Sequence, residues 1–148
     1  MHGSPTAFAL FVIAACAGAS ILAATFVSRM SGWHDLAARF ALQGEFPGER
    51  FRFKSARMKR GMNYNNCLTI GVSPVGFSIS MPLPFRMSHP ALFIPWSEIS
   101  YRPTKIWGLP MIRFQLGREN PVPFAVREQL ANKIKQAAGA SWPVEKIE

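Results

Sequence analysis

The sequence predicts one N-terminal transmembrane helix followed by a mainly-β (α+β) soluble domain. We expect this domain to be an antiparallel, partly open barrel of about seven strands that a C-terminal helix closes. Three observations lead to this fold class. Residues 6–28 carry no charged side chain. From Arg50 onward, charged and apolar residues alternate with a period of two, and residues 127–138 are amphipathic at helical spacing.

The uncharged N-terminal segment has the length of a membrane anchor. A helix rises about 1.5 Å per residue, so residues 6–28 span roughly 33 Å, enough to cross the hydrocarbon core of a bilayer. A cleaved signal peptide is less favoured, because the tail of residues 1–5 has no Lys or Arg and the apolar run is long. Residues 13–16 (IAAC) resemble a lipoprotein processing site. We therefore expect a retained helix, with processing at Cys16 as the alternative.

The distribution of charge predicts how this helix is oriented. All 17 Lys and Arg residues lie at or beyond Arg29, and positively charged flanks stay on the cytoplasmic side of a membrane. Outside the helix, Cys67 is the only thiol, as expected in a reducing compartment. We therefore expect the N-terminus outside and the soluble domain in the cytoplasm.

Part of the helix surface carries only small side chains. They form two adjacent rows at a spacing of four residues: Ala15, Ala19 and Ala23 in one, and Cys16, Ser20 and Ala24 in the other. Such surfaces let helices approach closely in lipid, so this one is a candidate helix-packing face. The alternative is an alanine-rich anchor with no contact there, since small residues are common in membrane helices.

Residues 29–49 are expected to form a juxtamembrane amphipathic helix and a linker. Ser31 can cap a short helix that runs through Gln43, and Gly44 is placed to end it. Residues 44–48 then form a linker into the β domain, which we place at residues 50–138. Residues 139–148 follow as a C-terminal tail.

The alternation that starts at Arg50 predicts a strand with two different faces. Phe51 and Phe53 are expected to point into the barrel, while Arg50, Arg52 and Lys54 face solvent. Further strands are expected over residues 66–72, 77–81, 91–94, 98–106, 111–116 and 122–125.

Strands followed by one closing helix is the order of elements in pleckstrin-homology-like (PH-like) barrels. Residues 68–73 (LTIGVS) with 76–81 (GFSISM) look like the second hairpin of small bacterial PH-like or GRAM-like domains. Residues 89–99 (HPALFIPWSEI) are similar to the segment in which those domains pass through Pro and an acidic residue into the next strand. The resemblance implies a domain that binds lipids or proteins, in a protein of the bacterial inner membrane. No phosphoinositide-binding motif accompanies it.

The soluble part carries the net charge of +9. Its densest cluster places six cations within eleven residues: Arg50, Arg52, Lys54, Arg57, Lys59 and Arg60. Beside a membrane helix these would attract anionic lipid, at about 1 kcal/mol per cation, or an acidic partner. Alternatively, they only keep a strand edge from pairing. Nucleic acid is not expected as a partner, because a membrane anchor limits access to it.

Trp107 lies beside Gly108 at an expected hairpin tip, and it suits a membrane interface or a protein contact. The alternative is that its ring folds back over the mouth of the barrel.

Catalytic chemistry has no clear signature here. The three histidines His2, His34 and His89 are scattered, and nothing in the sequence pairs the carboxylates of Glu98 and Glu119. We expect no enzyme activity, no metal, no cofactor and no small-molecule substrate.

The sequence therefore predicts a non-enzymatic accessory or scaffolding subunit of a larger membrane protein complex. Its helix would pack against partner helices, and its basic domain would brace the cytoplasmic face, with membrane lipids and other subunits as partners. The alternative is a free-standing anchored domain that binds anionic lipid headgroups or an acidic protein.

Overall fold

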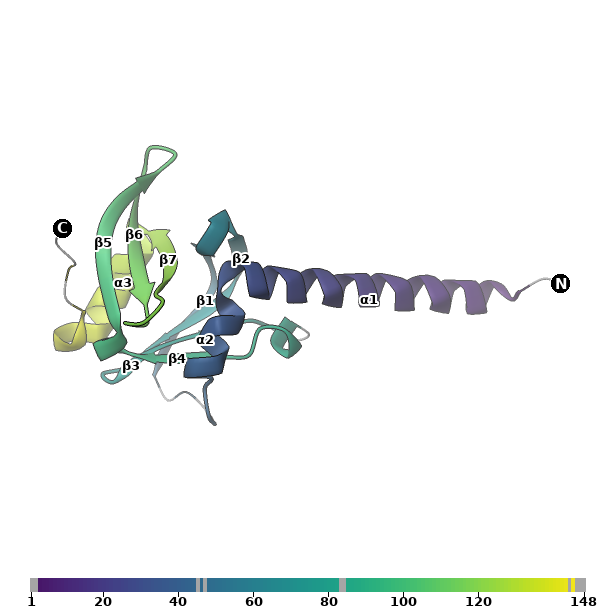
Figure 1. The fold of residues 1–148 in the computed structure, drawn as a ribbon, viewed down its shortest axis with the longest axis horizontal. Helices are drawn as coiled ribbons and strands as arrows, with labels where there is room; N and C mark the ends of the chain where they lie inside the picture. Colours follow the sequence, from purple (N-terminus) through teal and green to yellow (C-terminus); the bar gives the residue numbers. More distant parts are fainter. Residues whose placement is uncertain (1–2, 45, 47, 83–84, 144, 146–148) are drawn as a thin grey trace.

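The computed structural model describes residues 3–44, 46, 48–82, 85–143 and 145, and it confirms the predicted fold class. A long helix, α1 (Pro5–Ser31), leads into a short one, α2 (Trp33–Phe40). A curled seven-stranded antiparallel sheet follows, and then the C-terminal helix α3 (Glu128–Ala138). Figure 1 shows α1 projecting from the β domain as a separate rod, with the N-terminus at its far end.

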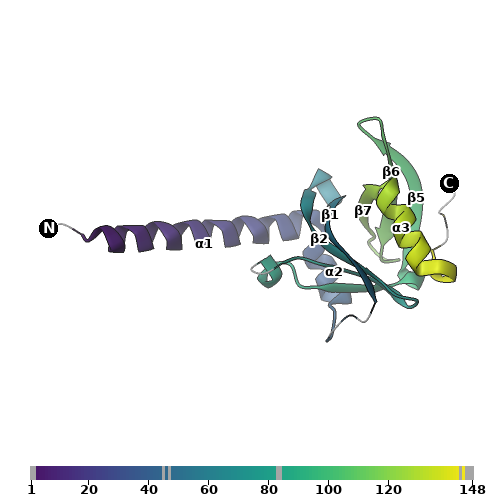
Figure 2. The same ribbon diagram turned by 180° about the vertical axis from the view of Figure 1, so that it is seen from behind.

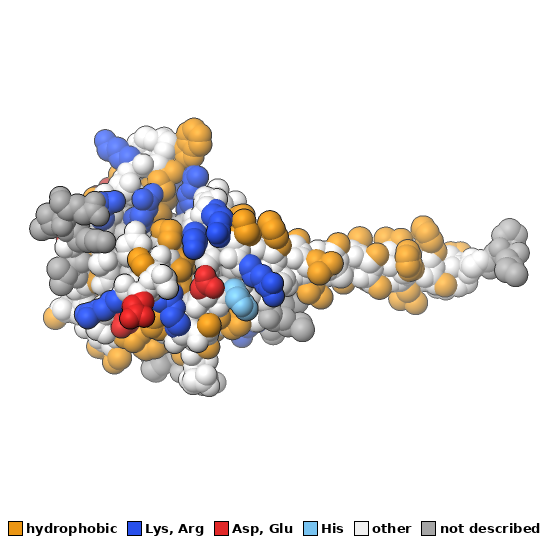
Figure 3. All heavy atoms as spheres, viewed as in Figure 1, with side chains coloured by type: hydrophobic (Ala, Val, Ile, Leu, Met, Phe, Trp, Pro, Cys, Tyr) orange, Lys and Arg blue, Asp and Glu red, His pale blue; other side chains and the backbone are white. Residues whose placement is uncertain are grey.

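Helix α1 is apolar and almost entirely uncovered. It begins after Ser4, whose hydroxyl accepts a hydrogen bond from the amide of Ala7. By length and composition it could cross a membrane, although a signal sequence near an N-terminus has the same properties. Only the last turns, which include the buried Ser28 and Ser31, enter the domain. In Figure 3, hydrophobic side chains cover the rod, while Lys and Arg gather on the domain.

The expected boundaries of α2 are wrong at both ends. Ser31 is the last residue of α1, and the cap of α2 is Gly32, whose φ of 91° separates the two helices. Glycine is required there, because a Cβ would lie 2.7 Å from the Cγ1 of Val122. At the other end, Ala41 is extended and bridges to Leu92, so α2 stops at Phe40 rather than near Gly44. Of the expected linker, residues 45 and 47 lie outside the described residues.

The strands are β1 (Glu49–Arg57), β2 (Asn63–Val72), β3 (Gly76–Ser80), β4 (Leu92–Pro95), β5 (Ile99–Ile106), β6 (Leu109–Leu116) and β7 (Val122–Arg127). Short 3-10 turns are η1 (Lys59–Gly61), η2 (Phe85–Met87), η3 (Trp96–Glu98) and η4 (Gly139–Ser141).

The order of the strands in the sheet is β4-β3-β2-β1-β7-β6-β5, so β1 and β7 join two halves of the sheet. Among the described residues, the β1–β7 ladder consists of one pair, Arg57 with Ala125. The sheet is therefore a half-barrel that is open along this seam. Helix α3 packs against β6, β7 and β2, across the mouth between the two halves (Figure 2).

A cluster of aromatic side chains fills the space between the two halves. The ring of Phe77 on β3 lies 6.0 Å from the rings of both Phe114 on β6 and Phe124 on β7. All three side chains are almost fully buried. Their burial removes large apolar areas from water and holds the halves together where backbone pairing is sparse.

The predicted faces of β1 are only partly correct. Phe51 packs against the core as expected, but Phe53 is 76% exposed. Between the pairs Phe51–Ile70 and Lys54–Leu68, β1 contains one residue more than β2, and Phe53 has a φ of 57°. One extra residue reverses the face taken by the side chains that follow it. The bulge therefore turns Phe53 outward and leaves Lys54 half-buried.

Candidate functional site

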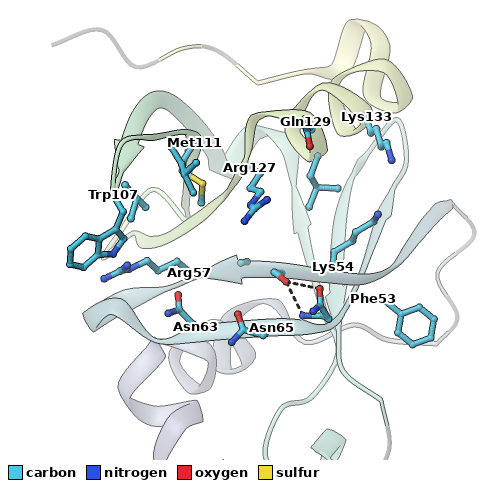
Figure 4. A pocket seen from close by; sticks show the side chains of 16 residues that line it. Phe53, Lys54, Arg57, Asn63, Asn65, Trp107, Met111, Arg127, Gln129 and Lys133 are labelled. Atoms are coloured by element: carbon cyan, nitrogen blue, oxygen red, sulfur yellow. Dashed lines mark hydrogen bonds between the residues drawn. The ribbon is translucent and has the colours of Figure 1, made fainter.

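A groove of about 590 Å³ opens where β1 and β7 separate (Figure 4). Strands β1 and β2 form one wall, and the β5–β6 hairpin, the end of β7 and the first turns of α3 form the other. Four cations line it: Lys54, Arg57, Arg127 and Lys133. None of the described lining residues is acidic. We call this site the basic groove, and its chemistry is suited to binding an anion.

The β1 side of the groove is made by five consecutive residues, 53–57. This run follows the bulge at Phe53, and hydrogen bonds across to β2 fix its shape. The Ser55 hydroxyl accepts a hydrogen bond from the backbone N–H of Asn66 at 2.8 Å and donates one to the Asn66 side-chain oxygen at 3.2 Å (dashed lines in Figure 4). Asn66 itself has a positive φ of 54°. The two strands are therefore held in an irregular pairing where they line the groove.

The opposite wall ends at the tip of the β5–β6 hairpin. Trp107 and Gly108 both have positive φ, 53° and 76°, as in the two-residue turns that best match the twist of a hairpin. Trp107 is 89% exposed. Its ring therefore does not fold back over the mouth of the barrel, so the alternative interpretation of Trp107 from the sequence is wrong. In Figure 4, the side chains of Trp107 and Arg57 point to the same end of the groove.

The six-cation cluster of the sequence is divided among three places. Lys54 and Arg57 line the basic groove. Arg50 and Arg52 lie instead in a second hollow of about 560 Å³, together with Arg86 from η2. This hollow also contains side-chain hydroxyls of β2 and β3, from Thr69, Ser78 and Ser80.

The last two cations of the cluster lie in η1, beside the end of α1. Arg60 donates a hydrogen bond to the carbonyl of Met30 at 2.9 Å, and Lys59 is half-buried next to it. A cation at the C-terminal end of a helix stabilises the free carbonyls and the helix dipole. Arg60 thus stabilises the end of α1 and is not available to the groove.

Sequence reasoning missed half of the cations in the groove. Arg127 and Lys133 were expected only as part of a closing helix, and the amides of Asn63, Asn65 and Gln129 were not singled out at all. No local pattern marks these residues. Their proximity to Lys54 follows from the way β7 and α3 close over β1, which is a property of the sheet order.

The expected helix-packing residues lie on the uncovered part of α1. Within the described structure, Ala15, Ala19 and Ala23 are exposed, and so are Cys16 and Ser20, while Ala24 is half-buried near the domain. The small-residue surface is therefore accessible to another helix.

A buried hydrogen-bonded cluster joins α1 to the domain. The Tyr64 hydroxyl on β2 lies 2.8 Å from the Ser31 hydroxyl and 2.9 Å from Nε2 of His89. The Nδ1 of His89 lies 3.1 Å from the Ser88 hydroxyl. Trp33 packs against the rings of Tyr64 and His89, and its indole N–H donates a hydrogen bond to the carbonyl of Pro90 at 2.8 Å. We call Ser31, Trp33, Tyr64 and His89 the helix joint.

Burial sets the protonation state of this joint. Desolvation lowers the pKa of His89 to about 4 and raises the pKa of Tyr64 to about 12. Both side chains are therefore neutral at pH 7, and both are almost fully buried. Such a closed, neutral cluster positions structural elements.

Of the residues that the structure describes, no three or more His, Cys, Asp or Glu side chains lie together as a possible metal site. Cys67 is half-buried in the second hollow, and burial raises the pKa of its thiol. This shift disfavours the reactive thiolate at neutral pH.

No protein-family model matches the sequence, and a search of curated proteins finds none that is similar. The structure defines the chain as a curled antiparallel β domain with a long apolar N-terminal helix, an architecture compatible with a membrane-anchored β domain.

Proposed function

We propose that this protein is a non-enzymatic, single-pass membrane protein that serves as an accessory or scaffolding subunit of a larger membrane complex. In this proposal α1 crosses the bacterial inner membrane and packs against partner helices, and the basic PH-like domain braces the cytoplasmic face. The observation that carries the proposal is the helix joint, in which the 2.8 Å contact between Ser31 and Tyr64 ties the end of α1 to the domain.

The joint supports a retained helix over a cleaved signal sequence. Ser28 and Ser31 are buried in the domain, and Val27 packs against the core. Cleavage after Ser31 would remove these contacts and would leave the buried Tyr64 hydroxyl without its hydrogen-bond partner in α1, which is costly. A removable leader has no need of such contacts with the mature domain.

The joint also supports a scaffold over a free-standing lipid sensor. A domain on a flexible linker can turn its basic surface toward a membrane. Here Gly32 is the one residue between α1 and α2, and buried hydrogen bonds fix its neighbours. The groove is therefore held at a fixed position relative to α1, as suits a partner in the same membrane. The uncovered small residues of α1 offer such a partner a second contact.

Native gel electrophoresis after extraction in a mild detergent tests the proposal. An accessory subunit should co-migrate with a large assembly, because its helix and its domain both contact other subunits. Migration as a small detergent-bound species in every mild detergent would contradict the proposal.

A second candidate function, binding of anionic lipid headgroups, is favoured by the second hollow. Arg50, Arg52 and Arg86 gather there beside hydroxyl groups that can donate to phosphate oxygens. Flotation of the full-length protein with anionic vesicles cannot test this function, because α1 would itself insert into the vesicles. Binding of a soluble glycerophosphoglycerol headgroup, compared between the wild-type protein and Arg52→Glu, tests it instead.

A further inference from the structure

We propose that the basic groove holds an extended acidic segment of a partner protein, lying along the open edge of β1. This inference rests on the proposed function, because it names the chemistry of the partner that the domain would hold. It concerns a surface built by residues far apart in the sequence, and it commits to one occupant.

The distribution of charge favours an elongated ligand. The four cations come from β1, β7 and α3, and Figure 4 shows them spread along the groove. Arg57 lies toward the Trp107 end, Arg127 lies near the middle, and Lys54 and Lys133 lie toward the other end. A single compact anion cannot meet all of them, whereas a chain with carboxylates spaced along its length can. Because the described lining contains no acidic side chain, these cations have no carboxylate partner within the groove.

The polar groups between the cations suit a polypeptide backbone. Asn63, Asn65 and Gln129 line the groove, and Figure 4 shows Asn63 and Asn65 pointing into it from β2. Each carboxamide both donates and accepts hydrogen bonds. A peptide backbone presents both donors and acceptors, whereas a phosphate or sulfate group only accepts. A site for a phosphate group alone would not need acceptors.

The edge of β1 offers backbone groups as well. Residues 53–57 line the groove, and the described β1–β7 ladder has its single pair at Arg57, the end of this run. An exposed strand edge is a template for pairing with an added strand. An extended acidic segment could therefore pair with β1 while its carboxylates meet the cations.

Apolar side chains complete the groove at the hairpin. Trp107 is 89% exposed, and Leu109 and Met111 lie beside it on β6. Trp and Met are enriched at protein–protein contacts, where large side chains lose water on binding. Burial of Trp107 would thus accompany docking of the segment.

The position of one wall of the groove is compatible with a protein partner. Figures 1 and 2 show the β5–β6 hairpin, which borders the groove, projecting away from the line of α1. The turn of the β1–β2 hairpin lies beside the end of α1, where Arg60 donates to the carbonyl of Met30.

Fluorescence anisotropy of the purified full-length protein in a non-ionic detergent tests this inference. The probe is a fluorescein-labelled decapeptide of alternating Glu and Val. It should bind at low ionic strength, and the double variant Arg127→Glu/Lys133→Glu should bind at least about tenfold more weakly. The matched control is Lys105→Glu/Lys135→Glu. Both of these lysines are exposed, lie on the neighbouring β5 and on α3, and are absent from the groove lining. Equal losses in the two variants, or no binding by wild type, would overturn the inference.

Two further probes separate the ligand classes. In one decapeptide the Val amides are methylated, and in the other the Glu amides, which blocks one or the other backbone edge. Pairing with β1 predicts that one of them binds at least about tenfold more weakly than the parent peptide. Unchanged binding of both would overturn the edge pairing. Inositol hexakisphosphate that binds as tightly as the peptide, with the same loss in Arg127→Glu/Lys133→Glu, would overturn the peptide in favour of a compact anion.

These measurements use the isolated protein, so they can contradict the acidic segment without contradicting the proposed function. Loss of peptide binding with persistent co-migration in native gels would leave the accessory role standing and remove only the acidic segment. Peptide binding by a protein that never joins an assembly would instead contradict the accessory role.

Discussion

The hydroxyl of Tyr64 lies 2.8 Å from that of Ser31, although the two residues are 33 positions apart in the sequence. Ser31 ends α1 and Tyr64 lies on β2, so this contact connects the apolar helix directly to the sheet. His89 completes the contact from the segment before β4. The position of the domain relative to α1 is thus set by a buried polar cluster rather than by a linker.

The variant Tyr64→Phe should therefore destabilise the domain. It removes one hydroxyl and leaves the polar atoms of Ser31 and His89 buried without it, which costs about 1–3 kcal/mol. Chemical unfolding of the full-length protein in detergent, followed by tryptophan fluorescence, measures the change. Tyr101→Phe is the control, because Tyr101 is only partly buried and lies outside the helix joint. Equal stability of Tyr64→Phe and wild type would show that the joint contributes little.

The joint should also make stability depend on pH. The pKa of His89 is about 4 in the folded protein, below its ordinary value of 6.5. Between these values the unfolded state binds a proton that the folded state does not. Stability should thus be unaffected by His89 above pH 6.5 and should fall toward pH 4, by up to about 1.4 kcal/mol per pH unit.

Unfolding across this pH range, compared between wild type and His89→Gln, isolates the effect. The Gln side chain can still accept a hydrogen bond from Tyr64 but cannot titrate. Its stability should therefore change less between pH 6.5 and 4 than that of wild type. Parallel pH profiles for the two proteins would mean that His89 does not carry the dependence.

The bulge in β1 predicts losses of stability of different size when Phe51 and Phe53 are truncated. Phe53→Ala should change the free energy of unfolding by only about 0.5 kcal/mol, because the ring is 76% exposed. Phe51→Ala should cost about 2 kcal/mol, since its ring packs against the core while remaining half-exposed. Denaturant unfolding of both variants tests the assignment. A loss for Phe53→Ala as large as that for Phe51→Ala would mean that β1 keeps a regular alternation.

This pair also shows where sequence reasoning stops. Alternation of apolar and charged residues located the strands, because burial of one sheet face selects side chains with a period of two. It could not locate the bulge, since the Ser55–Asn66 hydrogen bonds that hold it join two strands. The groove was unpredictable for a similar reason: Lys133 and Lys54 line the same groove only because β7 and α3 close over β1. The long apolar helix needed no such information, because its pattern is local.

Retention of the anchor predicts that alkaline carbonate will not release the protein from membranes. Mass spectrometry of the purified protein should find α1 intact, because its last turn is part of the domain core. A mature chain that begins after Ser31, or one that begins at a lipidated Cys16, would each contradict a full-length membrane-spanning helix.

The central claim, that α1 joins the protein to a larger assembly, is tested most directly by native gels of variants in the membrane helix. Ala19→Leu/Ala23→Leu enlarges the small-residue face and should separate the protein from the assembly without preventing insertion, since Leu is more apolar than Ala. Ala7→Leu/Ala14→Leu is the matched control, because helical spacing places these residues on the opposite side of α1. The proposal predicts that only the first variant leaves the large assembly. Unchanged co-migration of both variants, or loss of both, would contradict a specific helix contact at Ala19 and Ala23.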